Sequence, residues 1–593
     1  MAEETLVDES AGDGLPAGRF GTSAEAVTLT WRGDELLDDE LRAMLTGPGG
    51  PFERRIEPVL GAPAEVFVQR APHVPALLAD AARRTPDDPY LVFAGDPGET
   101  LTFAQVLRLV AAYAEVLSTR YGVGRGDRVA VAAANSRDHV LTFWATLSLG
   151  AVMVGLNGWW TPAELDHGIE LTEPLVVFGA GKPLARLRET RAAARVVVAS
   201  FEEVREAATA LADPPGSLPR VEIGEDDPAA IMFTSGTTGR PKGATLSHRN
   251  FVHFGLFGGL GGAVATLTGP AGRRQVPPGV QRASICSNPM FHVSGACVVL
   301  VNGPTFGIKL VFPPEGRWDE EVALRLTHEH RLTQWSGVPT HFWRMLTHPR
   351  FESYETAQVT TIGSGGSTFA PELLRLIGER MPGVQVTNGY GMTETTGTGT
   401  FLNGREMDGH PASVGAAAPT IAVQVRDPDG GPLLPGEVGE IWISGAGVFL
   451  GYWQDPGATA EVLTEDRWYR SGDYGRIVDG VLYLESRMRD MIIRGGENIY
   501  PIEIEYRLVE HAGIADACVI GVPHTVLGQE VKALVVPREG ASLTEREVRD
   551  WVAAALAAFK VPSYVEFRTE LPYNETGKVM KRRLELEAET AAG

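Results

Sequence analysis

The first half of the chain alternates short apolar runs with longer stretches in which apolar residues recur at helical spacing. Apolar runs at residues 89–93, 128–133, 175–179 and 195–199 predict buried strands, and residues 101–117 predict a long amphipathic helix between the first two. Strands that alternate with helices of this length are typical of doubly wound α/β layers. We expect these early layers to serve mainly as scaffold.

Three other regions depart from this alternation. Residues 1–20 are acidic and aperiodic, which predicts a disordered tail. Residues 35–45 carry apolar side chains at helical spacing, which predicts one helix ahead of the main body. Residues 491–593 predict a small α+β domain, with a first strand, a helix at 501–511, strands at 516–521 and 530–536, and a helix at 544–559.

Length and composition bound the possible functions. The chain has 593 residues, more than the roughly 250–300 at which a single core stops growing, so more than one domain is expected. A net charge of −22 argues against a nucleic-acid partner, because duplex affinity comes from Lys and Arg. The three cysteines are widely spaced, which suggests neither a disulfide framework nor a zinc site.

Targeting signals are absent from the pattern as well. The amino terminus is acidic where a signal peptide would be basic and then apolar. No apolar run approaches the ~20 residues that a membrane span needs. These features predict a cytoplasmic protein without a transmembrane segment.

One loop concentrates polar chemistry. Apolar residues 231–233 predict the end of a strand, and Thr234-Ser-Gly-Thr-Thr-Gly-Arg-Pro-Lys242 follows. Backbone N–H groups, hydroxyls and one ammonium can there converge on an anion, which predicts a phosphate-binding loop. Gly243 takes the place of the Ser or Thr that a Walker loop would have after its lysine. A bare loop of this composition would otherwise be a flexible surface turn.

The full string resembles the phosphate-binding signature of the adenylate-forming superfamily, which includes acyl-CoA synthetases, adenylation domains and firefly-type luciferases. Further motifs of that superfamily follow in its order, among them Asn388-Gly-Tyr-Gly-Met-Thr-Glu-Thr395, Ser471-Gly-Asp473 and Gly577-Lys578, and the resemblance covers about residues 75–590. It implies an α/β fold: a large N-terminal domain of doubly wound α/β layers plus a β-barrel-like subdomain, with a small mobile α+β C-terminal domain. It also implies that ATP activates a carboxylate as an acyl-adenylate, with release of pyrophosphate.

The resemblance assigns nucleotide-binding roles by position. Tyr390 lies against adenine, Thr393 on the phosphate, and Asp473 and Arg487 on the ribose. The complete set of implied cofactor-binding residues is Ser235, Gly236, Thr237, Thr238, Gly239, Gly365, Gly366, Ser367, Asn388, Gly389, Tyr390, Gly391, Thr393, Asp473 and Arg487, with Gly495 and Gly496 for the pantetheine arm of CoA.

Metal and catalytic roles follow in the same way. Glu394 is the implied ligand of Mg²⁺, a hard cation that usually takes one or two carboxylates plus phosphate oxygens. The implied catalytic residues are Lys242 and Thr234 at the phosphates, Lys578 between the substrate carboxylate and the ATP phosphates, and His292 as a gate. As a mobile point charge, lysine suits the role implied for Lys578. Electrostatic stabilisation of developing charge is typically the largest contribution to catalysis.

The boundary between the domains is also taken from the resemblance. In Ser486-Arg-Met-Arg-Asp490 two positions depart from the commonest pattern, and Arg489 stands where the superfamily pivots its small domain. We therefore expect a tail at 1–20, an extension packed on the main domain at 21–74, a large adenylation domain at 75–488 and a small domain at 489–593.

The acid substrate is the least constrained prediction. The expected pocket wall consists of His292, Trp335, Gly337, Gly363, Gly365, Met392 and Gly397, which includes several glycines and no Lys, Arg or Asp. An apolar acid fits best, because an unpaired charge at a pocket floor is costly.

We therefore expect a carboxylate–CoA ligase for a medium- or long-chain fatty acid, using ATP, Mg²⁺ and CoA, as a monomer or homodimer. An aryl acid is the alternative substrate, and an amine or a carrier-protein thiol is the alternative acceptor. A luciferase-like oxygenase and a non-catalytic nucleotide-binding relative are the more distant alternatives.

Overall fold

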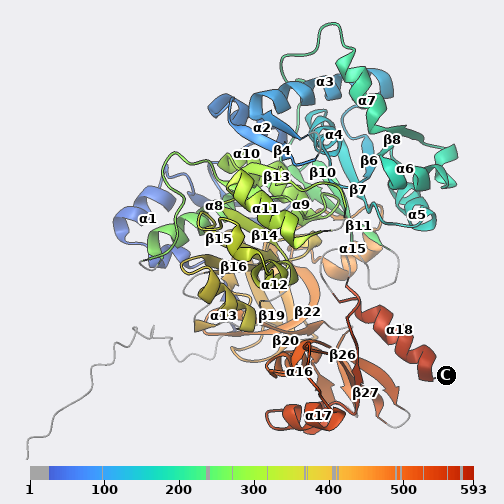
Figure 1. The fold of residues 1–593 in the computed structure, drawn as a ribbon. Helices are drawn as coiled ribbons and strands as arrows, with labels where there is room; N and C mark the ends of the chain where they lie inside the picture. The colour runs from blue at the N-terminus through green and yellow to red at the C-terminus, as the bar shows by residue number, and fades with distance from the viewer. Residues whose placement is uncertain are drawn as a thin grey trace, which may run out of the picture.

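A computed structural model describes most of the chain and shows a large α/β body with a smaller unit at its carboxyl end (Figure 1). The described residues are 26–95, 98–234, 241–269, 272–316, 318–365, 369, 371–403, 409–410, 413–487, 490–494, 497–524, 527–556, 558–573 and 579–592.

Two large sheets form the body. The first has seven strands in the order β21 (Gly451–Tyr452), β11 (Lys242–Ser247), β10 (Pro228–Thr234), β7 (Val152–Leu156), β6 (Arg128–Ala132), β8 (Val176–Gly179) and β9 (Val197–Ser200). The pairs from β10 to β9 are parallel, whereas β11 is antiparallel to both β10 and β21.

The second sheet has nine strands and a parallel centre. Its order is β18 (Ala416–Ala417), β17 (Thr400–Asn403), β16 (Gln385–Tyr390), β15 (Thr361–Gly365), β14 (Gln334–Gly337), β12 (Ala283–Ile285), β13 (Lys309–Phe312), β4 (Pro89–Phe93) and β5 (Glu99–Thr102). Helix α3 (Phe103–Tyr121) contacts β4, and its neighbour α4 (Arg137–Ser148) contacts β7 of the first sheet. The buried face of α3 is almost wholly apolar, whereas α4 also buries polar side chains, namely Asp138, His139, Thr142, Thr146 and Ser148.

The start of α3 shows how local sequence sets these elements. Thr102 and Gln105 form a capping box, each side chain accepting from the other residue's backbone N–H, and Gly122 ends the helix at φ 70°. The two largely parallel sheets, with helices packed on them, confirm the doubly wound α/β layers predicted from the alternating pattern.

A third, antiparallel sheet corresponds to the expected β-barrel-like subdomain. Its order is β1 (Thr28–Leu29), β19 (Ile421–Arg426), β20 (Gly439–Gly445), β22 (Tyr469–Val478) and β23 (Val481–Arg487). Strand β1 comes from the N-terminal extension and pairs with β19. The extension also forms a hairpin of β2 (Arg54–Val59) and β3 (Ala62–Phe67).

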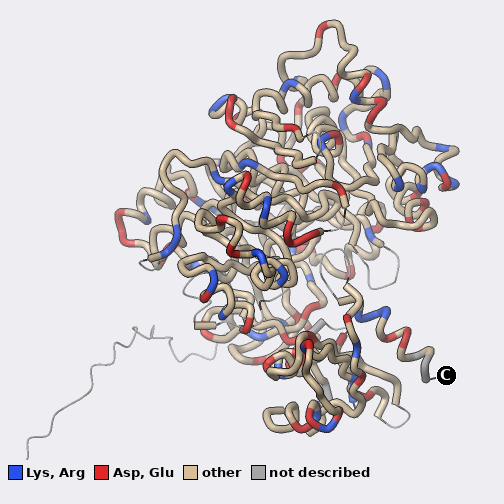
Figure 2. Tube along the Cα trace, viewed as in Figure 1, with Lys and Arg blue, Asp and Glu red and all other residues tan. Residues whose placement is uncertain are grey.

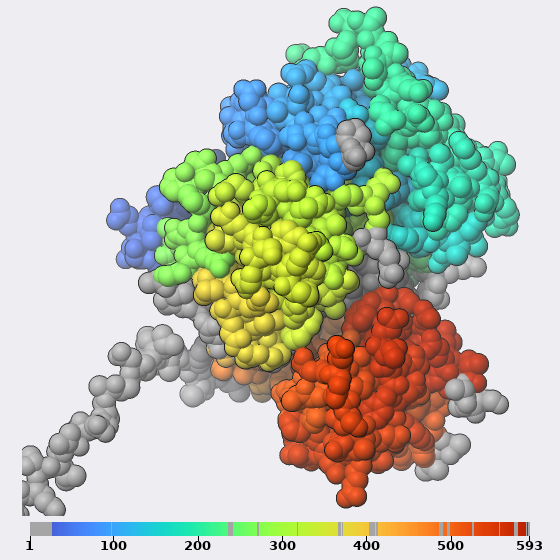
Figure 3. All heavy atoms as spheres, in the orientation of Figure 1, coloured from blue at the N-terminus to red at the C-terminus, as the bar shows by residue number. Residues whose placement is uncertain are grey.

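The carboxyl-terminal unit is a separate mass in the space-filling view, coloured red in Figure 3. Its sheet has the order β25 (Glu497–Ile499), β24 (Ile492–Arg494), β27 (Gly528–Pro537) and β26 (Ile514–His524), with β28 (Tyr564–Phe567) parallel to β27. Helices α16 (Pro501–Val509), α17 (Glu545–Ala553) and α18 (Lys581–Ala592) complete it. It contacts the large domain where the Arg538 guanidinium lies 5.4 Å from the Trp343 ring.

The remaining described α-helices lie outside the carboxyl-terminal unit. They are α1 (Asp39–Thr46), α2 (Val74–Arg84), α5 (Pro162–Thr172), α6 (Gly181–Arg188), α7 (Phe201–Thr209), α8 (His248–Thr268), α9 (Val293–Cys297), α10 (Gly303–Phe306), α11 (Glu320–His330), α12 (Pro339–Thr347), α13 (Pro371–Arg380) and α15 (Pro456–Val462).

The single helix predicted for residues 35–45 is wrong in its bounds. A 3₁₀ turn covers Gly33–Leu36, and α1 begins only at Asp39. The break occurs because Asp38 adopts an extended conformation and its carboxylate accepts from the Leu41 backbone N–H, which makes it an N-cap.

Helix α8 is the longest described apolar helix. By length and composition alone it could cross a membrane, which the sequence pattern did not anticipate. Leu260 and Val264 on α8 are buried in a cluster with Leu37, Leu45 and Phe67 of the extension. This packing is that of a core helix.

A cluster of charges fastens the extension to the start of α8. The Arg249 guanidinium donates to both oxygens of Asp226, at 2.7 and 2.9 Å, and lies 2.7 Å from Glu225 and 3.4 Å from Glu57 of β2. Arg70 bonds the same two glutamates, at 2.9 Å for Glu225 and 2.5 Å for Glu57. Elsewhere Figure 2 shows acidic and basic residues interspersed along the trace.

Replacing Arg249 by alanine is expected to lower the free energy of unfolding by about 3 kcal/mol, because Asp226 loses this guanidinium and Glu57 and Glu225 each lose one of their arginine partners, in a partly buried cluster. Chemical denaturation followed by tryptophan fluorescence measures this. The control is Arg325→Ala, which breaks the exposed Arg325–Glu329 pair on α11 and should cost about 0.5 kcal/mol. Equal losses in the two variants would contradict the expectation.

Candidate active site

The phosphate-binding loop predicted from sequence joins β10 to β11. Thr234 and Lys242 are cross-strand partners at the ends of these two strands. Both strands are buried over most of their length, which fixes the positions of Thr234 and Lys242. The loop residues Ser235, Gly236, Thr237, Thr238 and Gly239 lie outside the described part of the chain.

Lys242, Tyr452 and Glu394 come together beside that turn. The Lys242 ammonium lies 5.0 Å from the centre of the Tyr452 ring. The Tyr452 hydroxyl donates to Glu394 Oε1 at 2.8 Å, and Glu394 is only 6% exposed. The predicted phosphate-binding lysine and the predicted metal-binding carboxylate therefore both approach one tyrosine.

The turn that carries Glu394 is tightly packed. It is a 3₁₀ turn over Thr393–Thr395, followed by Thr396 and Gly397 at φ 55° and 75°. A Cβ added at Gly391 would lie 2.4 Å from the Gly397 carbonyl carbon, so only glycine permits this approach. Gly391 and Gly397 thus have a structural role in closing the turn that presents Thr393 and Glu394.

The residues expected at adenosine also lie together. The Tyr390 hydroxyl donates to Asp473 Oδ2 at 2.8 Å, and both side chains are buried. Arg487 on β23 is the cross-strand partner of Asp473 on β22. Strand β22 runs through Asp473 to Val478, so Ser471-Gly-Asp473 lies within a strand and does not end one.

Strands β15 and β16 place the remaining nucleotide candidates. Gly365 pairs with Gly389 and Ser364 with Asn388. A Cβ at Gly365 would meet no atom within 4 Å, so the space beside it is open. Asn388 Oδ1 is buried and accepts no hydrogen bond from the described residues, which leaves an acceptor for a bound group.

The electrostatics of the site keep its phenols protonated. Burial, and then the nearby Glu394 carboxylate, raise the pKa of Tyr452 above its usual value. The pKa of Tyr469 is raised by burial first and by Glu394 second. Both phenols therefore stay neutral, and Tyr452 donates its proton in a hydrogen bond to the Glu394 carboxylate.

His292 is held at the mouth of α9 by its neighbours. The Asn135 amide donates to the Asn288 carbonyl at 2.8 Å and accepts from the Met290 N–H at 2.8 Å, which fixes the preceding turn. The rings of Phe291 and His292 are 4.6 Å apart, and Trp159 packs edge-on against Phe291 at 5.1 Å. Trp159 is 47% exposed and was not anticipated from sequence.

The glycines of the expected pocket wall divide into two groups. A Cβ added at Gly397 would face Phe254 of α8 and Val293 of α9, at 3.7 and 4.0 Å. Gly363 on β15 faces Thr387 at 3.1 Å. Met392, half-buried, packs against the main apolar core.

Trp335 and Gly337 do not fit the expected wall. Trp335 is 2% exposed, and its indole N–H donates to Thr327 Oγ1 of α11 at 3.0 Å. Gly337 lies on the same face of β14 and faces His341 and Phe342 of α12. The pocket-wall prediction is corrected at these two positions, because their face of the sheet packs on helices.

Several predicted residues lie outside the described part of the chain. They are Gly366, Ser367, Arg489, Gly495, Gly496 and Lys578. The stems beside Lys578 are described: Tyr573 and Val579 form an antiparallel bridge, and the Met580 N–H donates to the Pro572 carbonyl at 2.8 Å.

The carboxylate chemistry fits Mg²⁺ held together with phosphate oxygens. Among the described residues no three or more His, Cys, Asp or Glu side chains are grouped to hold a metal ion. A single buried glutamate near an ammonium suits a cation that keeps several non-protein ligands. Glu394 would hold it, as the sequence predicts.

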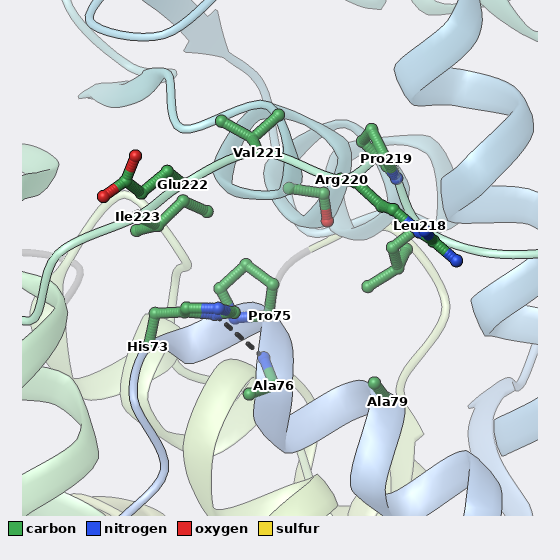
Figure 4. Close-up of a pocket in the computed structure, with 11 residues that line it drawn as sticks. His73, Pro75, Ala76, Ala79, Leu218, Pro219, Arg220, Val221, Glu222 and Ile223 are labelled. Carbon is green, nitrogen blue, oxygen red and sulfur yellow. Dashed lines mark hydrogen bonds between the residues drawn. The ribbon is translucent and has the colours of Figure 1, made fainter.

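Two surface hollows lie away from these residues. One, about 520 Å³, lies between the start of α2 and residues 218–223 (Figure 4). There His73 accepts from the Ala76 N–H as the N-cap of α2, so its ring serves the helix. The other hollow, about 650 Å³, lies between α2 and α8. Neither contains a residue predicted for the site.

Tyr452 is the residue that sequence reasoning missed. It follows Gly451 in a two-residue strand, and nothing in its spacing links it to the loop that ends at Lys242, 210 residues earlier. Tyr452 reaches the loop through the pairing of β21 with β11, a tertiary contact that sequence spacing does not reveal.

Comparison with known proteins gives a consistent result. The family model for AMP-binding enzymes matches residues 78–453, and that for their C-terminal domain matches residues 503–578. Feruloyl-CoA synthase of Amycolatopsis is 34% identical over 504 residues, covering 84% of this chain and 96% of that protein. The mitochondrial medium-chain acyl-CoA ligase ACSF2 of Danio rerio is 32% identical over 553 residues, covering 87% and 88%. ATP-bound MatB from Rhodopseudomonas palustris superposes with a TM-score of 0.76 at 30% identity, covering 88% of this chain and 100% of that structure.

Proposed function

This chain belongs to the AMP-binding enzyme family, and on that premise we propose that it is an AMP-forming carboxylate–CoA ligase for a medium- or long-chain fatty acid. Its members use ATP, Mg²⁺ and CoA. The observation that carries the proposal is the convergence of Lys242 and Glu394 on Tyr452, beside the bonded pair of Tyr390 and Asp473.

In the first half-reaction a carboxylate oxygen attacks the α-phosphorus of ATP, and the bond to the bridging oxygen breaks to release pyrophosphate. Lys242 and the hydroxyls from Thr234 onward offset the negative charge that develops on the leaving group. Asp473 accepts from the ribose and Tyr390 borders the adenine. Mg²⁺, when bound, would neutralise phosphate charge, and Glu394 would hold it. Lys578 holds the carboxylate and the phosphates in line.

In the second half-reaction the CoA thiolate attacks the acyl carbon of the acyl-adenylate, and AMP leaves. We propose that the small domain turns about Arg489, which withdraws Lys578 and brings Gly495 and Gly496 to the pantetheine arm. The domain limits 21–74, 75–488 and 489–593 are part of this proposal. No covalent bond to the enzyme forms in either step.

An apolar acid fits the described surroundings of Gly397. The Phe254 ring lies 3.7 Å from the Cβ that Gly397 would carry and packs edge-on against Phe257 at 5.3 Å, which supports an apolar surface on this side of the site. Such rings accommodate an acyl chain by apolar contact. The same rings, and the similarity to feruloyl-CoA synthase, support an aryl acid as the second candidate.

The test is pyrophosphate release by purified protein with Mg-ATP across fatty, aryl and amino acids, with and without CoA. Release that needs both CoA and a fatty acid of medium or long chain supports the proposal. Pyrophosphate release that needs CoA and occurs only with aryl acids would replace the fatty acid by an aryl acid as the proposed substrate. Pyrophosphate release that does not depend on CoA indicates an amine or a carrier-protein thiol as acceptor. No release with any acid of the panel contradicts an acid-activating enzyme.

A further inference from the structure

Tyr452 touches both charged groups of the proposed phosphate site and belongs to neither of their motifs. Its hydroxyl donates to Glu394 Oε1 at 2.8 Å, and its ring lies 5.0 Å from the Lys242 ammonium. A ring face attracts a cation, and a phenol orients the carboxylate that it bonds. One side chain can therefore set the positions of both groups.

Tyr452 is held from behind by a short segment, Ala446–Tyr452, which we call the strap. The buried Asn250 amide of α8 donates to the Ala446 carbonyl at 2.8 Å and to the Val448 carbonyl at 3.1 Å. The Arg467 guanidinium donates to the Val448 and Phe449 carbonyls, at 3.2 and 2.5 Å. These four bonds fix the strap to α8 and to Arg467, which precedes β22.

The strap also bonds the turn that carries Glu394. The Phe449 N–H donates to the Glu394 carbonyl at 2.8 Å, and the Thr396 hydroxyl donates to the Gly447 carbonyl at 2.8 Å. The ring of Phe449 packs edge-on against Tyr452 at 5.1 Å. Both the backbone carbonyl and the side chain of Glu394 thus accept hydrogen bonds from the strap.

We propose that Tyr452 is a positioning residue, whose hydroxyl orients the Glu394 carboxylate toward the metal–nucleotide complex and whose ring keeps Lys242 beside it. The inference rests on the proposed roles of Glu394 and Lys242. It adds a residue through which these two groups act together. Removing an outer partner of a metal-binding carboxylate typically weakens metal binding about 10–100-fold.

The experiment uses Tyr452→Phe, which removes the hydroxyl and keeps the ring. Binding of Mn²⁺ in the presence of ATP, followed by electron paramagnetic resonance, is expected to weaken about 10-fold. The Mg²⁺ concentration for half-maximal ATP–pyrophosphate exchange should rise by a similar factor, while kcat at saturating Mg²⁺ stays within about threefold. Tyr452→Leu, which also removes the ring, should in addition raise the KM for ATP.

Tyr113→Phe is the matched control. The Tyr113 hydroxyl donates to the buried Asp138 carboxylate at 2.5 Å, between α3 and α4. This variant should bind Mn²⁺ as the wild type does, and thermal unfolding monitors the fold of all variants.

Unchanged Mn²⁺ affinity in Tyr452→Phe would overturn the proposal, and so would equal weakening in Tyr452→Phe and Tyr113→Phe. If the wild type binds Mn²⁺ with ATP and only Tyr452→Phe weakens that binding, the positioning role stands. If that same wild type catalyses no exchange with any acid, the proposed function fails separately.

Discussion

Replacing Lys578 by alanine is expected to lower the rate of ATP–pyrophosphate exchange by roughly 10²–10³-fold, the usual loss when one charge-stabilising group is removed. Transfer of the acyl group from a supplied acyl-adenylate to CoA should stay within about threefold of wild type, because the proposed rotation has withdrawn Lys578 by that step. The measurement compares the two half-reactions of the same purified variant.

The described stems beside Lys578 give a physical reason for this sharp dependence. The Tyr573 hydroxyl bonds Asp516, and the half-buried Lys581 ammonium lies 2.7 Å from Glu505 and 3.2 Å from the Val519 carbonyl. Both ends of the segment are therefore anchored to β26 and α16.

Lys560→Ala is the control for Lys578→Ala. Lys560 belongs to the same small unit, and its ammonium pairs with Glu503 at 2.5 Å. This variant should keep both half-reactions. If Lys578→Ala slowed both half-reactions equally, the proposed exchange of loops between the two steps would be wrong.

Replacing Glu394 by glutamine is expected to reduce ATP–pyrophosphate exchange by roughly 10²–10³-fold at low Mg²⁺. Glutamine retains the size of the side chain and an oxygen that can accept from Tyr452, so the change removes mainly the negative charge. Titration with Mg²⁺ should restore part of the activity, because the metal then binds through the phosphates alone. The measurement is exchange rate against Mg²⁺ concentration.

Asp138→Asn is the matched variant for Glu394→Gln. Asp138 is also buried and also accepts from a tyrosine, Tyr113. It should leave the Mg²⁺ dependence of exchange unchanged even where it lowers thermal stability. A Mg²⁺ dependence that Glu394→Gln leaves unaltered would show that another group holds the metal.

The N-terminal extension illustrates the limit of periodicity. Apolar spacing at residues 35–45 predicted a helix, and Asp38 divided it because a local cap competes with continued helix. The contacts that give the extension its place, Arg249 with Glu57 and β1 with β19, join residues about 190 and 400 positions apart. No local pattern encodes them.

The pocket wall shows the same limit in the nine-stranded sheet. Trp335 lies on β14 and Gly363 on the adjacent strand β15. The sequence alone did not distinguish the face of these strands that packs on helices from the face toward the site. Trp335 is bonded to α11, so its face is set by which helix covers the sheet.

The sequence by itself determined the layered α/β class, the family and the identity of the polar groups, because buried strands, capped helices and uninterrupted motifs are local. Only the tertiary structure decided that Lys242, Glu394 and Tyr452 meet, that Tyr390 bonds Asp473, and that Trp335 belongs to the core. These contacts depend on strand pairing between segments far apart in the chain, whose energy comes from packing that no single segment contains.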